Sequence, residues 1–277
     1  MQQRPRPSGR VKIALTIAGS DSGGGAGIQA DLKTFHQFGV FGTSVVVAVT
    51  AQNTLGVRAV EAVSPALVAA QLAALAEDLP PAALKTGMLA EAGLVRLVAD
   101  AIRANAWRPL VVDPVMVATS GHRLLTPEGE SAIRDELLPL AALVTPNLDE
   151  AAILTGRPVT DVAAMERAGA ALVSLGAAAA LVKGGHLPGD ALTDVLVTRA
   201  GVRRFARTRI PSRATHGTGC TLSAAITAGL ALGRPLEQAV ADGLDFVHRA
   251  IAEAPGLGSG AGPLNHTVPP PPRTREQ

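Results

Sequence analysis

The sequence predicts an α/β fold, in which a mostly parallel central sheet carries helices on both of its faces. Short runs of Val, Ile, Ala and Leu alternate along the chain with longer segments of helical periodicity. Most of these short runs lack a polar residue at every second position, which is typical of strands buried on both faces. The 277 residues contain no long linker and no internal repeat, so we expect one large domain.

The predicted strands are short and mostly apolar. The last two follow each other through Arg199–Gly201, so we expect them to form an antiparallel hairpin. The strands are predicted at Val11–Ala18, Thr43–Thr50, Leu84–Thr86, Leu110–Asp113, Leu143–Thr145, Ala179–Lys183, Thr193–Val197 and Val202–Arg207.

The predicted helices fill the intervals and carry start and stop signals. Ser64 and Thr126 each precede a proline, which is favoured in the first helical turn. Gly39 and Gly233 are suited to end helices. The helices are predicted at Ile28–Phe38, Pro65–Asp78, Ala92–Asn105, Pro127–Leu138, Leu148–Leu154, Ala163–Leu175, Cys220–Ala231 and Leu236–Glu253.

The composition disfavours several classes of protein. The net charge is only +2, and the chain has five Phe, one Trp and no Tyr, too few aromatic rings for a single-strand stacking platform. Its basic clusters carry no nucleic-acid motif, and no apolar stretch reaches the ~18 residues of a membrane span. A single cysteine, Cys220, cannot form an internal disulfide. We therefore expect a cytoplasmic protein that binds neither nucleic acid nor membrane.

The two ends of the chain differ from the rest. Residues 1–10 contain RPRPSGR, and residues 267–277 contain four consecutive prolines, which favour an extended segment. We expect both ends to be disordered, with the folded domain spanning residues 11–266.

Ligands of open α/β sheets bind at the carboxyl ends of the strands, so the loops there are where chemistry is expected. The first loop contains three successive glycines, which allow close approach of the backbone to a ligand. It completes neither GxGxxG nor a P-loop. Asp21 and Asp31 could accept hydrogen bonds from ligand amines; a flexible turn before a capped helix is the structural alternative.

Amide and apolar side chains follow the next two strands. Gln52 and Asn53 combine donor and acceptor, which suits a heteroaromatic edge, although this stretch alone favours ordinary capping of the strand end. Met88 could form one wall for a flat ring or simply fill the core.

Charged residues follow the later strands. Asp113 could face a cation or a metal-bound phosphate, or only form an Asp-Pro turn. Asn147 and Glu150 have the spacing of a capping box, and the same carboxylate could hold Mg²⁺ through water. Lys183, one of four lysines, precedes two glycines and is suited to pair with phosphate.

THGTGCT precedes the helix predicted at Cys220. The backbone N–H groups of Gly217 to Cys220 would converge at its positive end, an arrangement that binds anions. The same dipole is expected to lower the pKa of the thiol and make Cys220 a better base. His216, beside the glycines, could touch phosphate. A small cysteine packed at a buried helix start is the structural alternative.

These segments together resemble a known family. The chain contains AGSD…GGAGIQADLKTF, VTAQNT.GV, K.GML, D.VM…SG..LL, TPNL.EA, KGGH and HGTGCTLSAA, in this order and from about Val11 to His266. It resembles the hydroxymethylpyrimidine/phosphomethylpyrimidine kinases of thiamine biosynthesis, within the ribokinase-like superfamily. One departure is SDSGGGAG, where the family usually has SDPSGGAG, with Ser22 and Gly23 in place of Pro and Ser.

The resemblance implies a ribokinase-like fold, a homodimer, and transfer of phosphate from MgATP to an aminopyrimidine alcohol and then to its monophosphate. It implies a pyrimidine site lined by Gly19, Asp31, Gln52, Met88 and Val115.

The resemblance also implies which residues face the phosphates. Nucleotide contacts are expected from Asn147, Lys183 and Thr218, and metal contacts from Asp113 and Glu150. An anion hole is expected from Gly217, Thr218 and Gly219, with Lys183 beside it and Cys220 as the base.

Other functions fit parts of the pattern. Many pyridoxal kinases of this superfamily have Asp where this chain has Cys220, so the cysteine favours the pyrimidine kinase without excluding pyridoxal or pyridoxine phosphorylation. A thiol nucleophile such as an acyl transferase would require an orienting partner for Cys220, and none is evident. A non-catalytic ligand-binding relative would not need Lys183, Glu150 and the glycine turn.

Overall fold

The computed structural model describes residues 11–116, 124–185, 187, 189 and 191–272, so the prediction for residues 1–10 lies outside the described part. Within it, nine strands form one sheet in the order β3-β2-β1-β4-β5-β6-β7-β8-β9. They are β1 (Ile13–Asp21), β2 (Phe41–Asn53), β3 (Gly56–Ala62), β4 (Ala83–Thr86), β5 (Leu110–Val112), β6 (Leu143–Val144), β7 (Ala179–Val182), β8 (Ala191–Thr198) and β9 (Gly201–Thr208).

The sheet is mostly parallel, as predicted. In the described part, β2, β1, β4, β5, β6 and β7 pair in parallel, whereas β3 and β8 run antiparallel to their neighbours. The predicted hairpin is confirmed, because β8 and β9 pair antiparallel from Ala191↔Thr208 to Thr198↔Gly201. The chain continues from β1 to β2 on one side and later to β4 on the other, so the strand order reverses at β1. Ligands of open α/β sheets bind at such a reversal.

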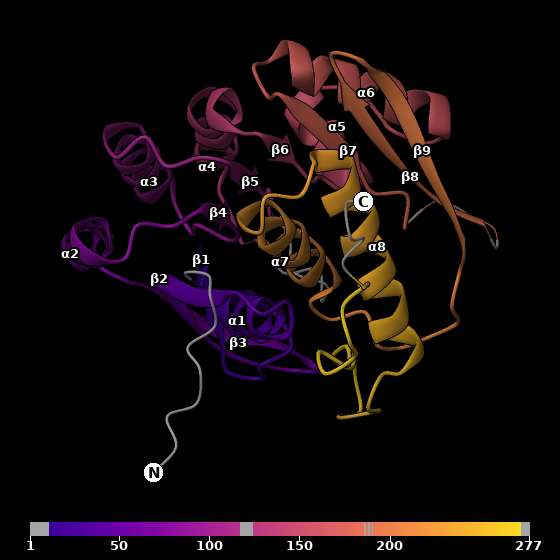
Figure 1. Cartoon of the computed structure of the whole chain (residues 1–277), viewed down its shortest axis with the longest axis horizontal. Helices are drawn as coiled ribbons and strands as arrows, with labels where there is room; N and C mark the ends of the chain where they lie inside the picture. Colours follow the sequence, from indigo (N-terminus) through magenta and orange to yellow (C-terminus); the bar gives the residue numbers. More distant parts are fainter. Residues whose placement is uncertain (1–10, 117–123, 186, 188, 190, 273–277) are drawn as a thin grey trace, which may run out of the picture.

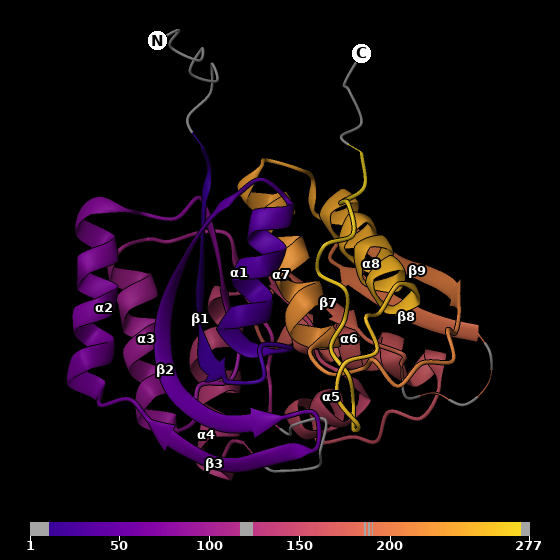
Figure 2. The ribbon, with the colours of Figure 1, turned by 90° about the horizontal axis from the view of Figure 1, so that it is seen from below.

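Helices cover both faces of the sheet, and the strands form a diagonal band between them in Figure 1. Figure 2 shows α2 and α3 on one side of β1, with α1 and α7 on the other. The helices are α1 (Gly27–Gln37), α2 (Pro65–Asp78), α3 (Ala92–Ala104), α4 (Pro127–Ala132), α5 (Leu148–Thr155), α6 (Val162–Ser174), α7 (Thr218–Ala231) and α8 (Leu236–Ala252).

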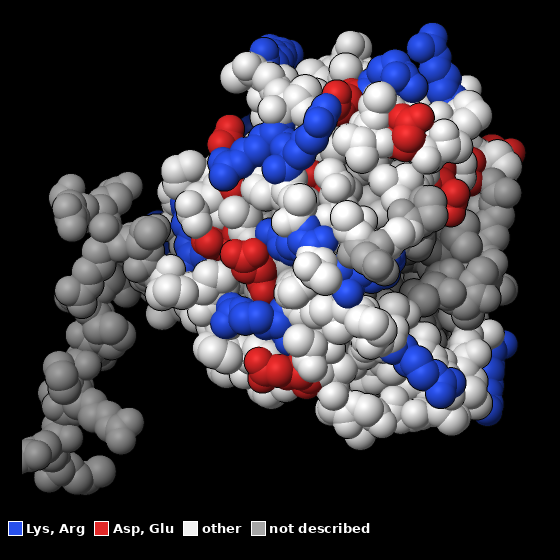
Figure 3. Space-filling model, turned by 90° about the vertical axis from the view of Figure 1, so that its right-hand side faces the viewer, with Lys and Arg blue, Asp and Glu red and all other residues white. Residues whose placement is uncertain are grey.

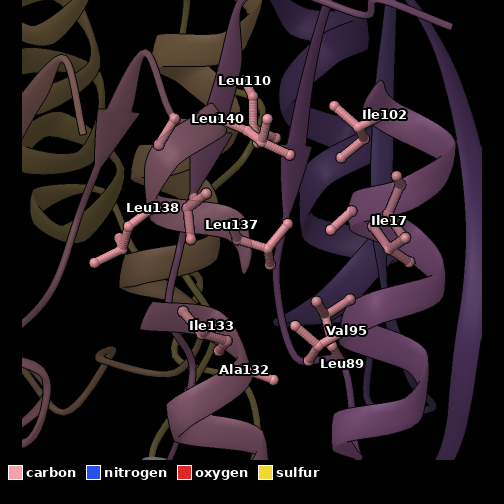
Figure 4. Close-up of a cluster of buried hydrophobic side chains, with 14 of the residues drawn as sticks. Ile17, Leu89, Val95, Ile102, Leu110, Ala132, Ile133, Leu137, Leu138 and Leu140 are labelled. Carbon is pink, nitrogen blue, oxygen red and sulfur yellow. The ribbon is translucent and has the colours of Figure 1, made fainter. Parts of the chain in front are cut away.

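The core consists of two layers, because successive strand residues point to opposite faces. Leu15 and Ile17 of β1 pack with α2 and α3, whereas Ala14 joins the layer under α1, α7 and α8. Figure 4 shows part of the first layer, where Ile17 lies near Val95 and Ile102 of α3.

The structure differs from the predicted elements in several places. The predicted strands omit β3, an edge strand that pairs with the end of β2. The helix predicted to Leu138 ends at Ala132 and continues as a π turn, Ile133–Leu137, and a 3₁₀ turn, Leu138–Leu140. The predicted tail begins too early, because Val268 is buried beside α1 and α8; residues 273–277 lie outside the described part.

Charges on the side of β8 and β9 are mixed rather than gathered. Figure 3 shows basic and acidic side chains interspersed over this face. The arginines of β9 pair with acids of neighbouring helices, as in Arg203–Glu237 at 2.7 Å and Arg204–Glu166 at 2.6 Å. These acids partly neutralise the basic side chains of β9, a strand that belongs to one of the basic clusters in the sequence. None of the helices in the described residues is both long and apolar enough to cross a membrane.

Candidate active site

Two glycine loops meet at the carboxyl ends of the parallel strands. The first follows β1, and the second precedes α7. Gly217 is the N-cap of α7 with φ +83°, and a Cβ atom there would lie 1.8 Å from the carbonyl oxygen of Gly25. A left-handed φ and so close a contact both require glycine. The two loops are therefore in direct contact at the point where the strand order reverses.

Asp21, the last residue of β1, makes contacts with both of these loops. Its carboxylate accepts hydrogen bonds from the backbone N–H groups of Gly23, Gly25 and Ala26 at 2.8, 3.0 and 2.8 Å. His216 Nε2 lies 2.8 Å from its Oδ2 atom. Burial alone would raise the pKa of Asp21, but the bonds from His216 and the backbone outweigh it and lower the pKa, so the group is ionised.

This arrangement corrects two predictions from the sequence. Asp21 does not offer a free acceptor to a ligand amine, because protein donors occupy its oxygens. His216 is buried and its Nε2 atom faces Asp21 rather than open space, so that nitrogen does not reach a phosphate. Both residues instead hold the first glycine loop against the start of α7.

Gln52 lies at the same junction, near the end of β2. Its Nε2 atom is 3.3 Å from His216 Nε2, and its Oε1 atom is 3.3 Å from Thr50 Oγ1. The Ser22 hydroxyl donates to the Gln52 carbonyl and accepts from its N–H, both at 2.8 Å. Ser22, which replaces the usual proline, therefore fastens the first loop to β2. The half-buried amide of Gln52 combines donor and acceptor within this site.

Gly19, Met88 and Val115 follow or lie near the ends of adjacent strands. The Gly19 N–H donates to the Met88 carbonyl at 3.1 Å, and a Cβ on Gly19 would lie 2.6 Å from Met88 Cε. The N–H of Val115 donates to the Asp113 carbonyl at 2.9 Å. Thus the structure brings Gly19 and Met88 into contact, and the buried Met88 and half-buried Val115 follow neighbouring strands β4 and β5.

The start of α7 presents backbone donors. The helix begins at Thr218, two residues earlier than predicted, so Thr218, Gly219 and Cys220 form its first turn. The first N–H groups of a helix have no partner inside it. The Thr218 N–H makes only a long bond of 3.4 Å to Thr215, whose carbonyl also accepts from the Thr218 hydroxyl at 2.9 Å. This turn therefore has the donors and the positive end of a helix that bind anions.

A lysine and two carboxylates flank this turn. Lys183 Nζ lies 3.4 Å from Asp113 Oδ1 and 3.9 Å from Glu150 Oε2. A Cβ on Gly219 would lie 3.3 Å from Lys183 Nζ and 3.6 Å from Asp113 Oδ2. Burial alone would lower the pKa of Lys183, but Asp113 and Glu150 outweigh it and raise the pKa. The lysine is therefore charged beside the anion-binding turn.

Asn147 and Glu150 form the capping box that the sequence allowed. The Asn147 side chain accepts from the Glu150 N–H at 2.9 Å, and Glu150 Oε2 accepts from the Asn147 N–H at 2.8 Å. Asn147 therefore has a structural role at the start of α5. Burial raises the pKa of Glu150 to about 7, against the effect of Lys183, so this carboxylate loses its proton near neutral pH.

Asp113 and Glu150 fit a magnesium ion better than a tightly held transition metal. They are two buried carboxylates that share one ammonium group, and a cation would relieve the cost of ionising Glu150. Mg²⁺ commonly binds one or two carboxylates together with waters and substrate phosphates. Among the described residues, no three His, Cys, Asp or Glu side chains gather as a ligand set.

Asp31 differs from its predicted role. It is fully buried on α1, where Oδ2 accepts from the Thr16 hydroxyl at 2.6 Å and Oδ1 lies 2.8 Å from Lys85 Nζ. The prediction that Asp31 offers an open acceptor to the pyrimidine is corrected, because the protein engages both oxygens. Lys85, also fully buried, is a site neighbour that the sequence analysis missed. Its position within K.GML, at a strand end, was the available signal.

Cys220 lies in the first turn of α7 and is half-buried. The dipole was expected to lower the pKa of its thiol, and this is wrong. Burial raises the pKa to about 12, although Lys85 acts in the opposite direction. Removing water from the thiol therefore outweighs the favourable charges, and the resting group is a neutral thiol.

Comparisons with known proteins show which family the chain resembles. A family model described as phosphomethylpyrimidine kinase matches residues 21–265. A hydroxymethylpyrimidine/phosphomethylpyrimidine kinase of Rhizobium meliloti is 54% identical over 92% of this chain and 96% of its own length. A phosphomethylpyrimidine kinase structure from Clostridium difficile has a TM-score of 0.78 and 42% identity, covering 87% of this chain and 99% of its own. An ADP complex of Bacillus subtilis pyridoxal kinase has a TM-score of 0.87 and 37% identity, with coverages of 93% and 98%.

Proposed function

The chain belongs to the phosphomethylpyrimidine kinase family, and from this premise we propose how its site transfers a phosphoryl group. It is a phosphotransferase of thiamine biosynthesis that uses ATP to phosphorylate 4-amino-5-hydroxymethyl-2-methylpyrimidine at its hydroxymethyl group. The resulting monophosphate is phosphorylated again to the diphosphate.

One observation supports the proposed site above all others. The start of α7, whose first N–H groups have no partner within the helix, adjoins the charged Lys183 and the carboxylate of Asp113. Backbone N–H groups and a lysine suit a transferring phosphoryl group, whose charge is spread over three oxygens. The carboxylates of Asp113 and Glu150 suit the metal that accompanies ATP.

In this proposal, Gln52 recognises the aminopyrimidine edge. Its amide can donate to a ring nitrogen and accept from the exocyclic amine. Met88, which packs directly against Gly19, forms one wall for the flat ring, and Val115 adds apolar contact. Asp21 and His216 act indirectly, by holding Gln52 near the anion-binding turn.

The transfer step uses the first turn of α7. The substrate hydroxyl oxygen forms a bond to the γ-phosphorus, the bond from that phosphorus to the bridging oxygen breaks, and ADP leaves. Cys220 in its thiolate form receives the hydroxyl proton. The N–H groups of Gly219 and Cys220, with Gly217 shaping the turn, stabilise the charge together with Lys183. Thr218 and Asn147 lie next to the nucleotide phosphates in this proposal.

Mg²⁺ is the proposed companion of ATP. When bound, it would supply positive charge to the phosphates. Asp113 and Glu150 would hold it, directly or through water, and Glu150 would then be ionised. Proton transfer is the smaller contribution in such reactions, and general-base assistance is typically worth about 10²–10⁴-fold.

Pyridoxal or pyridoxine phosphorylation is the second candidate. It is supported by the Bacillus subtilis pyridoxal kinase, which is 37% identical to this chain and shares its fold. The same turn and lysine would serve a different heteroaromatic alcohol, so substrate preference depends on residues such as Gln52 and Met88.

A coupled assay of ADP formation tests these alternatives. The aminopyrimidine alcohol, its monophosphate and pyridoxal are compared at equal concentrations, with Lys183→Met as a site variant and exposed Lys12→Met as a charge-matched control. We expect the highest kcat/KM with the two pyrimidines and a large loss only in Lys183→Met. A higher kcat/KM with pyridoxal would reverse the assignment, and no ADP with any alcohol would support a non-catalytic ligand-binding relative.

We also propose a cytoplasmic homodimer, on the family resemblance and the single cysteine. Sedimentation equilibrium of the purified chain tests the oligomeric state. A mass of two chains is expected, and a single-chain mass at micromolar concentration would contradict it.

A further inference from the structure

Lys85 is a fully buried cation without a role in the mechanism above. Its side chain and that of Asp31 are both 0% exposed, and Nζ lies 2.8 Å from Asp31 Oδ1. The second oxygen of Asp31 accepts from Thr16 at 2.6 Å. Asp31 is therefore held from two neighbouring strands, with Thr16 on β1 and Lys85 on β4.

Lys85 lies on the face of the sheet that α1 and α7 cover. Ala83, two residues earlier on β4, packs in the layer under α1, α7 and α8, whereas Leu84 packs on the opposite face. Alternation along the strand puts Lys85 on the α7 side. Lys85 Nζ also lies 3.9 Å from where a Cβ on Gly87 would be, close to the end of β4. α7 packs directly against β4 and carries Cys220 in its first turn, so the buried ammonium group lies on the side of β4 that faces this helix.

Stability is a weak explanation for this pair. Taking two charges out of water costs several kcal/mol per ion, and a buried ion pair often stabilises a fold no better than apolar residues of similar size. Apolar side chains surround the same sheet face and would fill the space. Strongly perturbed titratable groups gather at functional sites.

Four charged groups from four parts of the chain act on Cys220. Lys85 on β4 lowers the pKa of the thiol, whereas Asp31 on α1 and Asp113 after β5 raise it. Lys183, after β7, also interacts with Cys220, and the negative charge of a thiolate would raise the pKa of that lysine. Of the effects that lower the pKa of the thiol, that of Lys85 is the largest.

We propose that Lys85 is a positioning residue for phosphoryl transfer, whose ammonium group, fixed by Asp31, stabilises the negative charge that Cys220 carries as a proton acceptor. Cys220 first loses its proton to solvent and then receives the hydroxyl proton as the new oxygen–phosphorus bond forms. The inference rests on the proposed function for its catalytic meaning. The effect of Lys85 on Cys220 is independent of which alcohol is phosphorylated.

The chain makes this effect measurable, because Cys220 is its only cysteine and it has no tyrosine. Alkylation by iodoacetamide reports the thiolate fraction of one residue, since the thiolate is the nucleophile. Ultraviolet absorbance of the thiolate can be titrated without interference from tyrosinate. Both measurements use the folded, substrate-free protein.

The test compares Lys85→Met with wild type and with exposed Lys12→Met, which changes net charge equally. We expect alkylation of Cys220 near neutral pH to slow about tenfold in Lys85→Met only, the effect of about one pKa unit from a nearby charge. A loosened fold would expose the thiol and speed alkylation, so slowing is specific to the charge. An alkylation rate equal to that of Lys12→Met would overturn the proposal.

Asp31→Asn should change the pKa of the Cys220 thiol in the opposite direction to Lys85→Met, and it provides a second test if Lys85→Met does not fold. It removes a negative charge near the thiol and leaves Lys85 unneutralised, so the thiolate should appear at lower pH than in wild type. A titration at the same or higher pH would overturn the proposal.

In turnover, we expect Lys85→Met to lower kcat, with the KM for ATP nearly unchanged and the pH profile of kcat moved to higher pH. Absence of kinase activity with every alcohol would remove the proposed function, while the alkylation results would still decide the role of Lys85.

Discussion

At the scale of single residues, the site depends on a position that only glycine can occupy. Gly217 combines a φ of +83° with direct contact to the Gly25 carbonyl. A non-glycine residue in the left-handed region costs about 1–2 kcal/mol, and a Cβ there would also displace the first loop. The backbone at this residue therefore determines whether the two glycine loops can meet.

Gly217→Ala tests this requirement. We expect the free energy of unfolding to fall by about 2 kcal/mol or more, and kcat to fall as the turn moves. Gly233→Ala is the matched control, because Gly233 has a φ of +81° and nothing within 4 Å of its Cβ position. Urea unfolding and turnover are measured for both. Equal losses in the two variants would show that contact with Gly25 is unimportant.

Glu150 gives a pH-dependent prediction. Its pKa is 4.5 without perturbation and about 7 in the fold, so the folded state binds more protons between these values. The contribution of Glu150 to the free energy of unfolding, without Mg²⁺ or nucleotide, should therefore be nearly complete at pH 5 and fall by up to about 3 kcal/mol as pH rises through 7.

Glu150→Gln should lose this decline while keeping the cap on Asn147, because the amide oxygen can still accept its bond. Exposed Glu61→Gln should keep the wild-type decline. Urea unfolding at pH 5 and 8, values chosen on either side of about 7, makes the comparison. A decline in Glu150→Gln equal to that of wild type would assign the pH dependence to another group.

The roles of Asp21 and Asp31 could not be predicted from the sequence around them. Asp21 and Asp31 were predicted as open acceptors from their place near a glycine loop, but His216 and Lys85 occupy them. Those partners are 195 and 54 residues away in sequence, so local spacing carries no sign of them. The raised pKa of Cys220 likewise depends on burial, which the GTGCT pattern does not report.

At the scale of elements, loop positions matter as much as helices and strands. The guanidinium of Arg209 donates to the carbonyls of Gly185, Leu187 and Gly189 at 2.7, 2.6 and 2.9 Å. These residues follow β7 directly after Lys183. Arg209 therefore holds in place the segment that follows Lys183, the lysine proposed to contact the phosphates.

Arg209→Met should loosen this segment and weaken nucleotide binding. We expect the KM for ATP to rise about tenfold. Hydrogen bonds to a charged group are worth about 1.5–3 kcal/mol each, and part of the energy of the lost bonds should appear as weaker ATP binding, because Lys183 is less well positioned. The KM for the alcohol should change little. Exposed Arg157→Met is the control, and steady-state kinetics measure both. A rise in the KM for the alcohol alone would contradict this role.

Most elements could be predicted because their patterns are strong. Apolar runs gave the parallel strands, and Ser64-Pro65 marked the start of α2. β3 was missed because its residues are mostly exposed and its main signal is pairing with β2, which is not local. The helix at Pro127 was predicted too long because its pattern continues through a π turn and a 3₁₀ turn.

At the scale of the whole molecule, the sheet gathers residues from the entire length of the chain. The carboxyl ends of β1, β2, β4, β5, β6 and β7 all lie at one edge, because these strands are parallel. Asp21 and His216 are far apart in the sequence, but they are in contact at the point where the strand order reverses. The fold therefore supplies one preorganised edge, and the loops supply its chemistry.

The most direct test is a crystal structure of the chain with ADP, Mg²⁺, a planar phosphoryl mimic and the aminopyrimidine alcohol. We expect the mimic to accept hydrogen bonds from the Gly219 and Cys220 N–H groups, with Lys183 Nζ beside it and the alcohol oxygen in line. A mimic bound away from the first turn of α7, with those N–H groups bonded within the protein, would contradict the account.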